Sequence, residues 1–261
     1  MNFSNIRMET GAAGIAVITI DRPEKLNALN RNVMAELRQA FEAATVDSAI
    51  RGLILTGAGE KAFVAGADIR ELADIDPVGA ERLSAQGQTT FRLLENMGKP
   101  SVAAINGFSL GGGMELALAC TGRIAAENAK LGQPEVKLGI VPGYGATQRL
   151  PRLVGRGRAL ELLLTGDVID AQEAYRIGMV NHVVPQADLL SFTTAWMHKI
   201  LANGPLAVAL TMQAVDAGYD AGTEAGFRFE ALAFGLTAAT GDRREGTQAF
   251  LEKRAPRFTG K

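Results

Sequence analysis

The chain has 261 residues, of which 47% are apolar and 21% are charged, and its formal net charge is −1. This length and composition suit one large domain, or a domain with a smaller appendage, built around a substantial buried core. A net charge so close to zero gives no electrostatic reason to expect nucleic acid or an acidic membrane surface as a partner.

The single cysteine, Cys120, excludes an internal disulfide framework and is typical of a reducing compartment. Cys120 lies in an apolar stretch, which favours a buried, inert thiol over a nucleophile. The first residues carry no apolar signal core, and no window approaches about 18 consecutive apolar residues. We therefore expect a cytoplasmic protein that does not span a membrane.

The first part of the chain alternates predicted strands and helices, which favours a layered α/β core. Asn30 is expected to cap a helix whose apolar residues share one face, and Gly98-Lys99-Pro100 is expected to end another helix. The expected strands cover residues 15–20, 52–56 and 101–105, and the expected helices follow Asn30 and cover residues 77–97.

Residues 61–69 form a loop of small apolar residues around Gly66. Such a loop lets a ligand approach the backbone closely. We interpret Asp68, near its end, as a cap for the structure that follows, with a chemical role as the alternative.

Three glycines, Gly111 to Gly113, separate the strand at residues 101–105 from an apolar segment, residues 114–120, that is expected to be a helix. A helix N-terminus offers free backbone N–H groups, and its dipole favours negative charge. Glu115 follows in the first turn, so this junction is a candidate reaction centre. The structural alternative is an acidic residue that only stabilises the helix dipole.

Residues 131–145 contain too many glycines and prolines for a plain helix, and Glu135 lies among them. A carboxylate in such a loop is usually solvated. Further on, Asp170 with Glu173 is expected to start a helix by capping-box logic. Helices are also expected at residues 146–153 and 156–164, and an extended segment at residues 179–184.

From residue 187 the pattern becomes helical, with a break at Asn203-Gly204-Pro205. We place a domain boundary near residue 200, between a core of residues 1–200 and a helical region of residues 201–261. The apolar faces of the last helices must pack on the core or on another subunit.

The motifs of several common site types are missing from the sequence. There is no phosphate-binding Gly-x-x-x-x-Gly-Lys loop, no Gly-x-Gly-x-x-Gly turn after a strand and no Gly-x-Ser-x-Gly elbow. The only histidines, His182 and His198, are too far apart to suggest a metal cluster. Backbone N–H donors and carboxylates remain, and these suit oxyanion stabilisation with proton transfer.

Four motifs, in order along the chain, resemble the crotonase superfamily, and within it the enoyl-CoA hydratases most closely. The motifs are residues 63–68, 106–116, 132–135 and 142–150, and the likeness extends from residues 21–23 to residues 245–254. The resemblance implies an α/β fold, a spiral of β-β-α units followed by a helical C-terminal trimerisation region. It also implies a homotrimer or homohexamer and an acyl-CoA thioester substrate, with no metal and no cofactor besides the substrate's own coenzyme A.

The resemblance also implies roles for individual residues. The backbone N–H groups of Ala67 and Gly112 would clamp the thioester oxygen as an oxyanion hole. Glu115 would hold and deprotonate water, and Glu135 would deliver a proton to the α-carbon. The positions that match substrate or CoA contacts are Lys25, Ala65, Gly66, Asp68, Ile69, Phe250 and Lys253, although the lysines could equally be solvated surface residues.

The activity so implied is reversible syn addition of water to 2-enoyl-CoA thioesters to give 3-hydroxyacyl-CoA, in fatty-acid or related acyl-CoA degradation. One alternative is an enoyl-CoA isomerase or another acyl-CoA lyase of the same superfamily, and a second is a non-catalytic relative that binds acyl-CoA or RNA. The presence of both Glu115 and Glu135 favours hydration, because relatives with other chemistry commonly lack one of them.

Overall fold

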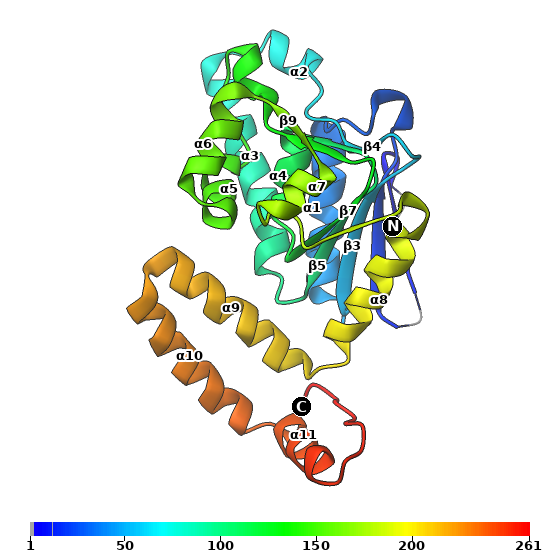
Figure 1. Cartoon of the computed structure of the whole chain (residues 1–261), viewed down its shortest axis with the longest axis vertical. Helices are drawn as coiled ribbons and strands as arrows, with labels where there is room; N and C mark the ends of the chain where they lie inside the picture. Colours follow the sequence, from blue (N-terminus) through cyan, green and yellow to red (C-terminus); the bar gives the residue numbers. More distant parts are fainter. Residues whose placement is uncertain (1–2, 12) are drawn as a thin grey trace. The chain divides into compact units, whose positions relative to one another are not determined.

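The computed structural model describes residues 3–11 and 13–261 (Figure 1). The chain divides into two compact units. The larger, N-terminal unit runs up to Met97 and continues over Ser101–Thr194, and the smaller, C-terminal unit combines Gly98–Pro100 with Ala195–Lys261.

The larger unit contains a sheet of six strands among the described residues, in the order β1-β2-β3-β5-β7-β10. All neighbours pair in parallel except β1 and β2. Strands β3, β5 and β7 are buried along their whole length, which explains their continuous apolar sequences. The bounds are β1 (Ile6–Thr10), β2 (Ile15–Ile20), β3 (Gly52–Gly57), β5 (Ser101–Ile105), β7 (Gly122–Ala126) and β10 (His182–Val184).

A second sheet has the order β4-β6-β8-β9 in the described part of the chain, with β9 antiparallel to β8. The chain passes from each inner strand of the first sheet to a short strand of the second: β3 to β4, β5 to β6 and β7 to β8. This repeat gives the expected succession of β-β-α units. The short strands are β4 (Ala62–Val64), β6 (Phe108–Leu110), β8 (Lys130–Gly132) and β9 (Val168–Asp170).

Two buried asparagine side chains fix the turns between the sheets. Asn106, after β5, donates to the carbonyls of Gly57 at 2.9 Å and Gly59 at 2.7 Å. Asn27 donates to the carbonyls of Ala58 at 3.0 Å and Ala62 at 2.8 Å. Each side-chain amide binds backbone carbonyl groups that are left unpaired where the strands end. The turns are therefore held by side-chain hydrogen bonds in place of backbone pairing between strands.

The helices of the larger unit follow the sequence expectations closely. Asn30 caps α1 by accepting from the Val33 N–H at 2.9 Å, and Asp170 caps α7 by accepting from the Glu173 N–H at 2.8 Å, as predicted. Asp68 lies one residue before the N-cap of α2, Ile69, and its Oδ1 atom accepts from the N–H of Arg70, the first residue of that helix, at 3.4 Å, so it acts on the helix start as expected, from one position earlier than a standard cap. The bounds are α1 (Arg31–Val46), α2 (Arg70–Ala73), α3 (Pro77–Asn96), α4 (Gly112–Leu118), α5 (Ala146–Val154), α6 (Arg156–Thr165) and α7 (Ala171–Arg176).

The described part of this unit also contains three short 3₁₀ turns: η1 (Pro23–Lys25), η2 (Pro134–Leu138) and η3 (Gln186–Asp188). Side chains from the first sheet, α1, α3 and α4 meet in one apolar core that includes Leu37, Phe91 and Met114. Figure 1 shows α1, α3 and α4 beside the strands of the first sheet. The apolar face predicted for the helix after Asn30 therefore points into this core.

The smaller unit is helical, with α9 (Pro205–Ala221), α10 (Thr223–Ala238) and α11 (Gly241–Leu251) after α8 (Leu189–Leu201), which crosses the unit boundary. Helices α9 and α10 lie side by side, and a Cβ atom on Gly226 would stand 2.8 Å from the Cα atom of Gly218. Asp242 holds the final residues by accepting from the N–H groups of Thr259 at 2.7 Å and Gly260 at 2.8 Å.

Across the described ranges, no single helix is long and apolar enough to cross a membrane, and only the bent pair 186–201 and 205–221 meets that criterion when joined.

Candidate active site

Two loops meet where strands β4 and β6 end. These strands pair in parallel, with Val64 opposite Ser109, so their carboxyl ends lie at the same edge of the sheet. A Cβ atom on Gly66 would lie 3.6 Å from the carbonyl oxygen of Leu110, and one on Gly113 would lie 2.1 Å from the carbonyl oxygen of Val64. The loop of residues 65–69 and the start of α4 are therefore in direct contact, and only glycine fits at position 113.

The two expected oxyanion donors sit on these loops. Leu29 forms a parallel bridge with Ala67, through Leu29 N–H to the Gly66 carbonyl at 2.9 Å and Asp68 N–H to the Leu29 carbonyl at 2.7 Å. Successive peptide groups of an extended segment point to opposite sides, so the Ala67 N–H points away from this bridge. Gly112 is the first residue of α4, where helix geometry provides no acceptor for its N–H.

Glu115 is buried, with 1% of its surface exposed. Its Oε1 atom accepts two hydrogen bonds from backbone N–H groups, from Tyr144 at 2.8 Å and from Ala146 at 2.9 Å. Burial raises the pKa of Glu115, while the two N–H groups and the charge of Arg149 oppose this rise. Both bonds use Oε1.

Glu135 lies in η2 and is half-buried, so it is not the fully solvated loop carboxylate that the sequence also allowed. A Cβ atom on Gly111 would be 3.0 Å from Glu135 Oε1, which places this carboxyl group over the start of α4. With its amide nitrogen facing Glu135, buried Gln133 donates to both carboxyl oxygens, at 3.1 and 2.9 Å.

The two glutamates influence each other electrostatically. Burial raises the pKa of Glu135 to about 7, and the charge of Glu115 adds to this rise. A carboxyl group with such a pKa is present in both protonation states near neutral pH. Two carboxyl groups that interact in this way titrate as a coupled pair, a common arrangement in acid–base centres.

Tyr144 is a site residue that sequence reasoning missed, although it lies in one of the four motifs. Its ring packs edge-on against Phe91, with ring centroids 5.6 Å apart and an interplanar angle of 82°. A Cβ atom on Gly87 would stand 2.2 Å from one edge of the ring, and one on Gly112 would stand 3.3 Å from the other edge. The ring thus fills the space between α3 and the start of α4.

The other predicted contact residues fall into two groups. Ala65 donates to the carbonyl of Leu26 at 3.0 Å, so η1, with exposed Lys25 at its end, lies beside the loop of residues 65–69. Ile69 is 52% exposed on that loop. Phe250 and Lys253 belong to the other unit, on α11 and just after it, and Phe250 is 83% exposed.

Asp68 is engaged in ion pairs, with Arg22 at 3.5 Å and Arg70 at 3.4 Å. Burial alone would raise the pKa of Asp68, but the hydrogen bonds and charge of Arg70, together with Arg22, lower it below its ordinary value. This carboxylate therefore stays ionised and organises the loop through its ion pairs.

Within residues 3–11 and 13–261, no three His, Cys, Asp or Glu side chains are grouped so that they could hold a metal ion. His182 instead packs its ring against Phe192, with centroids 5.2 Å apart. A pair of interacting carboxyl groups beside the free N–H groups of a helix start, carried on an α/β fold, is the arrangement of a candidate acid–base centre.

Comparison with known proteins agrees with this interpretation. A family model described as "Enoyl-CoA hydratase/isomerase" matches residues 10–261. The chain is 50% identical to the crotonyl-CoA hydratase of Syntrophomonas wolfei over 100% of both chains, and 45% identical to the short-chain-enoyl-CoA hydratase of Clostridium acetobutylicum over 97% of both. A crystal structure of an enoyl-CoA hydratase from Bacillus anthracis matches with a TM-score of 0.95 at 42% identity, covering 99% of this chain and 100% of that one.

The chain belongs to the enoyl-CoA hydratase/isomerase family. Its fold is the α/β crotonase fold of these structures, with a helical C-terminal region, as the sequence motifs implied.

The raised pKa of Glu135 predicts how stability depends on pH. The value rises from 4.5 to about 7 in the folded chain, so this group contributes stability that is complete below about pH 4.5 and is lost as the pH rises through about 7. At about 1.4 kcal/mol per unit of pKa difference, reduced because the group is partly exposed, we expect a loss of about 1–2 kcal/mol.

Urea unfolding between about pH 5 and about pH 8 measures this loss. The variant Glu135→Gln should lose less stability over that range than the wild type. The matched control Glu81→Gln, on the exposed side of α3, should follow the wild type. If Glu135→Gln keeps the full pH dependence, the carboxyl group does not titrate as stated.

Proposed function

We propose that this protein hydrates 2-enoyl-CoA thioesters reversibly, by syn addition of water, to give 3-hydroxyacyl-CoA. The observation that carries the proposal is the pair of glutamates at the start of α4: Glu115 is fixed by two backbone N–H groups, and Glu135 lies over Gly111. The named activities of the similar proteins from Syntrophomonas wolfei and Clostridium acetobutylicum support it.

The oxyanion-hole assignment explains how the reaction barrier falls. When the water oxygen bonds to the β-carbon, the π electrons move toward the thioester oxygen, which becomes negatively charged. The N–H groups of Ala67 and Gly112 stabilise that charge, and the N-terminal end of α4 adds a favourable dipole. Losing one such donor typically costs about 10²–10³ in rate.

The two glutamates divide the proton transfers. Glu115, held by its Oε1 atom, takes the proton of the attacking water with its other oxygen, while the hydroxyl adds to the β-carbon. Glu135, with a pKa of about 7, gives its proton to the α-carbon. Proton exchange through solvent then returns both glutamates to their starting protonation states. Because the two carboxyl groups titrate as a coupled pair, naming one as base and the other as acid assigns the protons to one particular microscopic state of the pair.

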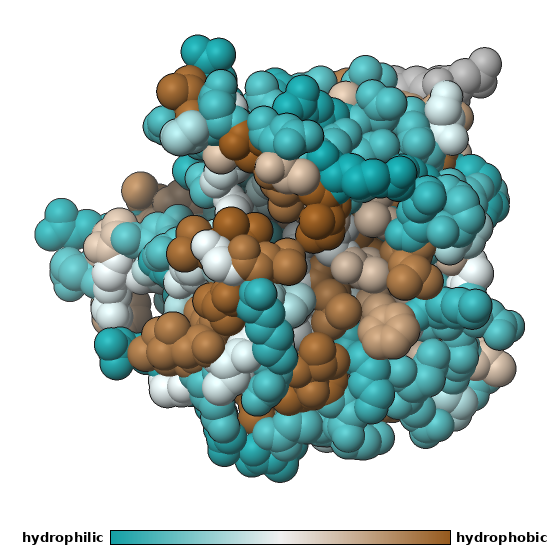
Figure 2. Space-filling model, turned by 90° about the horizontal axis from the view of Figure 1, so that it is seen from above, coloured by the Kyte–Doolittle hydropathy of each residue, from teal (hydrophilic) through white to brown (hydrophobic). Residues whose placement is uncertain are grey.

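We also propose that the loop of Ala65, Gly66 and Ile69 lines the substrate entrance, with Lys25 beside it. Phe250 and Lys253 are proposed CoA contacts on the basis of the family motifs alone. Apolar residues after Glu135 are exposed, with Ile140 at 42% and Val141 at 74%. The space-filling view in Figure 2 shows apolar side chains gathered near the middle of one face, with hydrophilic ones around them.

Replacing either glutamate by glutamine should remove most of the hydration while CoA binding persists, because the acid–base group is lost and the shape is kept. We expect about 10²–10⁴-fold lower kcat for Glu115→Gln and for Glu135→Gln. The loss of the enoyl-thioester absorbance band of crotonyl-CoA measures the rate, and Glu81→Gln is the control.

Wild-type turnover in either glutamine variant would remove that glutamate from the mechanism. A wild-type enzyme that shifts the double bond of 3-enoyl-CoA but does not hydrate crotonyl-CoA would identify the isomerase instead.

We further propose that the enzyme prefers short acyl chains. The Tyr144 ring is 7% exposed and fixed between Gly87, Phe91 and Gly112, so it occupies space beside the oxyanion turn that a long chain would need. The names of the similar proteins, crotonyl-CoA hydratase and short-chain-enoyl-CoA hydratase, support the same preference.

A panel of 2-enoyl-CoA substrates of increasing chain length tests this preference. Removing the ring in Tyr144→Ala opens volume while keeping the backbone N–H that binds Glu115. We expect kcat/KM to fall at least about tenfold from four-carbon to ten-carbon substrates in the wild type, and this ratio to narrow in Tyr144→Ala. Tyr144→Phe keeps the ring and should behave as the wild type. An unchanged ratio in Tyr144→Ala would contradict the role of the ring.

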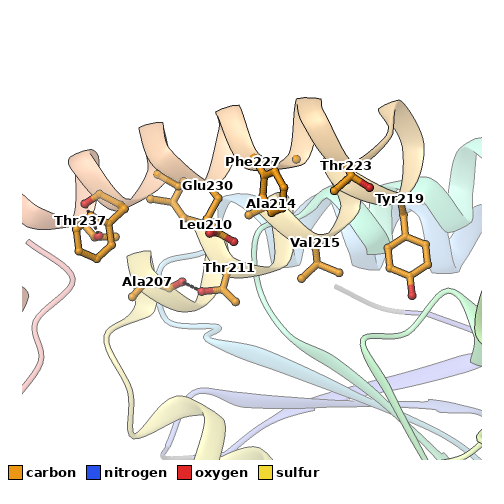
Figure 3. Close-up of a pocket in the computed structure, with 14 residues that line it drawn as sticks. Ala207, Leu210, Thr211, Ala214, Val215, Tyr219, Thr223, Phe227, Glu230 and Thr237 are labelled. Atoms are coloured by element: carbon orange, nitrogen blue, oxygen red, sulfur yellow. Dashed lines mark hydrogen bonds between the residues drawn. The ribbon is translucent and has the colours of Figure 1, made fainter.

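Finally, we propose a homotrimer or homohexamer in which α9 and α10 contact another copy of the chain. These helices enclose a groove of about 690 Å³, shown in Figure 3, whose lining is largely apolar. Large apolar side chains on α10 stay exposed, including Phe227 at 63%, Leu232 at 70% and Phe234 at 77%. So much exposed apolar surface on one helix marks an association face.

Sedimentation of the purified chain should give three or six times the protomer mass of 27.5 kDa. A charge at the proposed face, in Phe227→Glu or Phe234→Glu, should shift the protein to smaller species. Val46→Glu changes an exposed apolar residue on α1 and should leave the mass unaltered. A monomeric wild type would contradict the proposed contact.

A further inference from the structure

The loop that holds Glu115 is itself held by an ion pair between two helices. Arg149, on α5, donates from Nη1 to the carbonyl oxygen of Tyr144 at 2.7 Å. The same guanidinium binds Glu95, on α3, through two parallel hydrogen bonds of 2.6 and 2.8 Å. A bidentate pair of this kind fixes both position and orientation.

This ion pair is shielded from solvent, since the side chains of Arg149 and Glu95 are only 15% and 31% exposed. Gly145 makes room for it: a Cβ atom there would lie 2.2 Å from Nη1 of Arg149. The loop that binds Glu115 and the ion pair are therefore in direct contact.

A second set of bonds from α3 reaches the same loop one peptide earlier. Ser84 donates to the carbonyl oxygen of Gly143 at 2.6 Å, and Gln88 donates to it at 3.0 Å. The carbonyl groups of Gly143 and Tyr144 are thus tied to α3 and α5, while the N–H groups of Tyr144 and Ala146 point to Glu115.

We propose that Arg149 and Glu95 are positioning residues of the hydratase site, which hold the Tyr144 and Ala146 N–H groups against Glu115 and keep it ready to accept a proton. Neither residue contacts the substrate in this arrangement. The inference rests on the proposed function. It adds which residues fix the position of the Glu115 carboxylate and influence its ionisation.

The charged and titratable groups that act on Glu115 come from several elements: Arg149 from α5, Glu135 from η2 and Tyr144 from the loop itself. Glu95, on α3, is paired with Arg149. The charge of Arg149 lowers the pKa of Glu115, against the effect of burial. Removing that charge should raise this pKa, whereas neutralising Glu95 leaves the charge of Arg149 less compensated and should lower it.

The test compares Arg149→Gln, Arg149→Lys and Glu95→Gln in the full-length protein. Arg152→Gln is the matched control, because Arg152 lies on the same helix and its hydrogen bonds go to exposed Gln148. The pH profile of kcat with crotonyl-CoA reports the ionisation of the base. Infrared titration of the carboxyl bands, taken as the difference from the matching Glu115→Gln double variant, reports the same group without substrate.

We expect kcat to fall roughly 10–100-fold in Arg149→Gln, with the acidic limb moved up by roughly 0.5–1 pH unit. In Glu95→Gln the limb should move in the opposite direction, and Arg149→Lys should restore its position while recovering only part of kcat. Arg152→Gln should match the wild type.

Opposite shifts of the limb support the proposal, because a purely structural role would lower stability without moving the limb in two directions. If the wild type is active and the variants lose stability while the acidic limb of kcat stays in place, the proposal is overturned. A wild type inactive on crotonyl-CoA refutes the proposed function instead, and the infrared titration then decides the present inference by the same two shifts.

Discussion

The two hydrogen bonds from the N–H groups of Tyr144 and Ala146 to Glu115 join the start of α4 to the start of α5. A buried carboxylate without partners would be very costly, so these bonds make the two helix starts depend on each other. Three features surround this junction: the ring of Tyr144, the carboxyl group of Glu135 next to Gly111, and the loop of residues 65–69, which contacts the first turn of α4.

The two sheets bring this junction together without help from a long-range covalent link. Because β4 and β6 are parallel neighbours, the segments after them leave the sheet at one edge, and Asn27 and Asn106 fix the turns that lead into these strands. Small residues then allow backbone to touch backbone, as Gly113 does with Val64. The site is thus a product of strand order and close packing, and its side chains are few.

Features with a local cause were predictable from the sequence. The strand of residues 15–20 and the caps at Asn30 and Asp170 depend on residues within one segment, and they are as expected. The strands of the second sheet have three residues each, which is too short for a periodic pattern to reveal them. Helix α4 begins at Gly112, two residues before the expected start at residue 114, because glycines form part of its first turn. Glu115 was recognised by its place in a helix start. The burial of Glu135 arises from contacts across the chain, which no local pattern reveals.

The contact between Gly87 and the ring of Tyr144 restricts how the family can diverge. A side chain at position 87 would overlap the ring, since its Cβ atom would lie 2.2 Å from it. The two positions therefore cannot drift separately: a homologue that acquires even an alanine at 87 must first give up the aromatic residue at 144. Paired changes at positions 87 and 144 would mark the relatives in which the space between α3 and the start of α4 is filled differently.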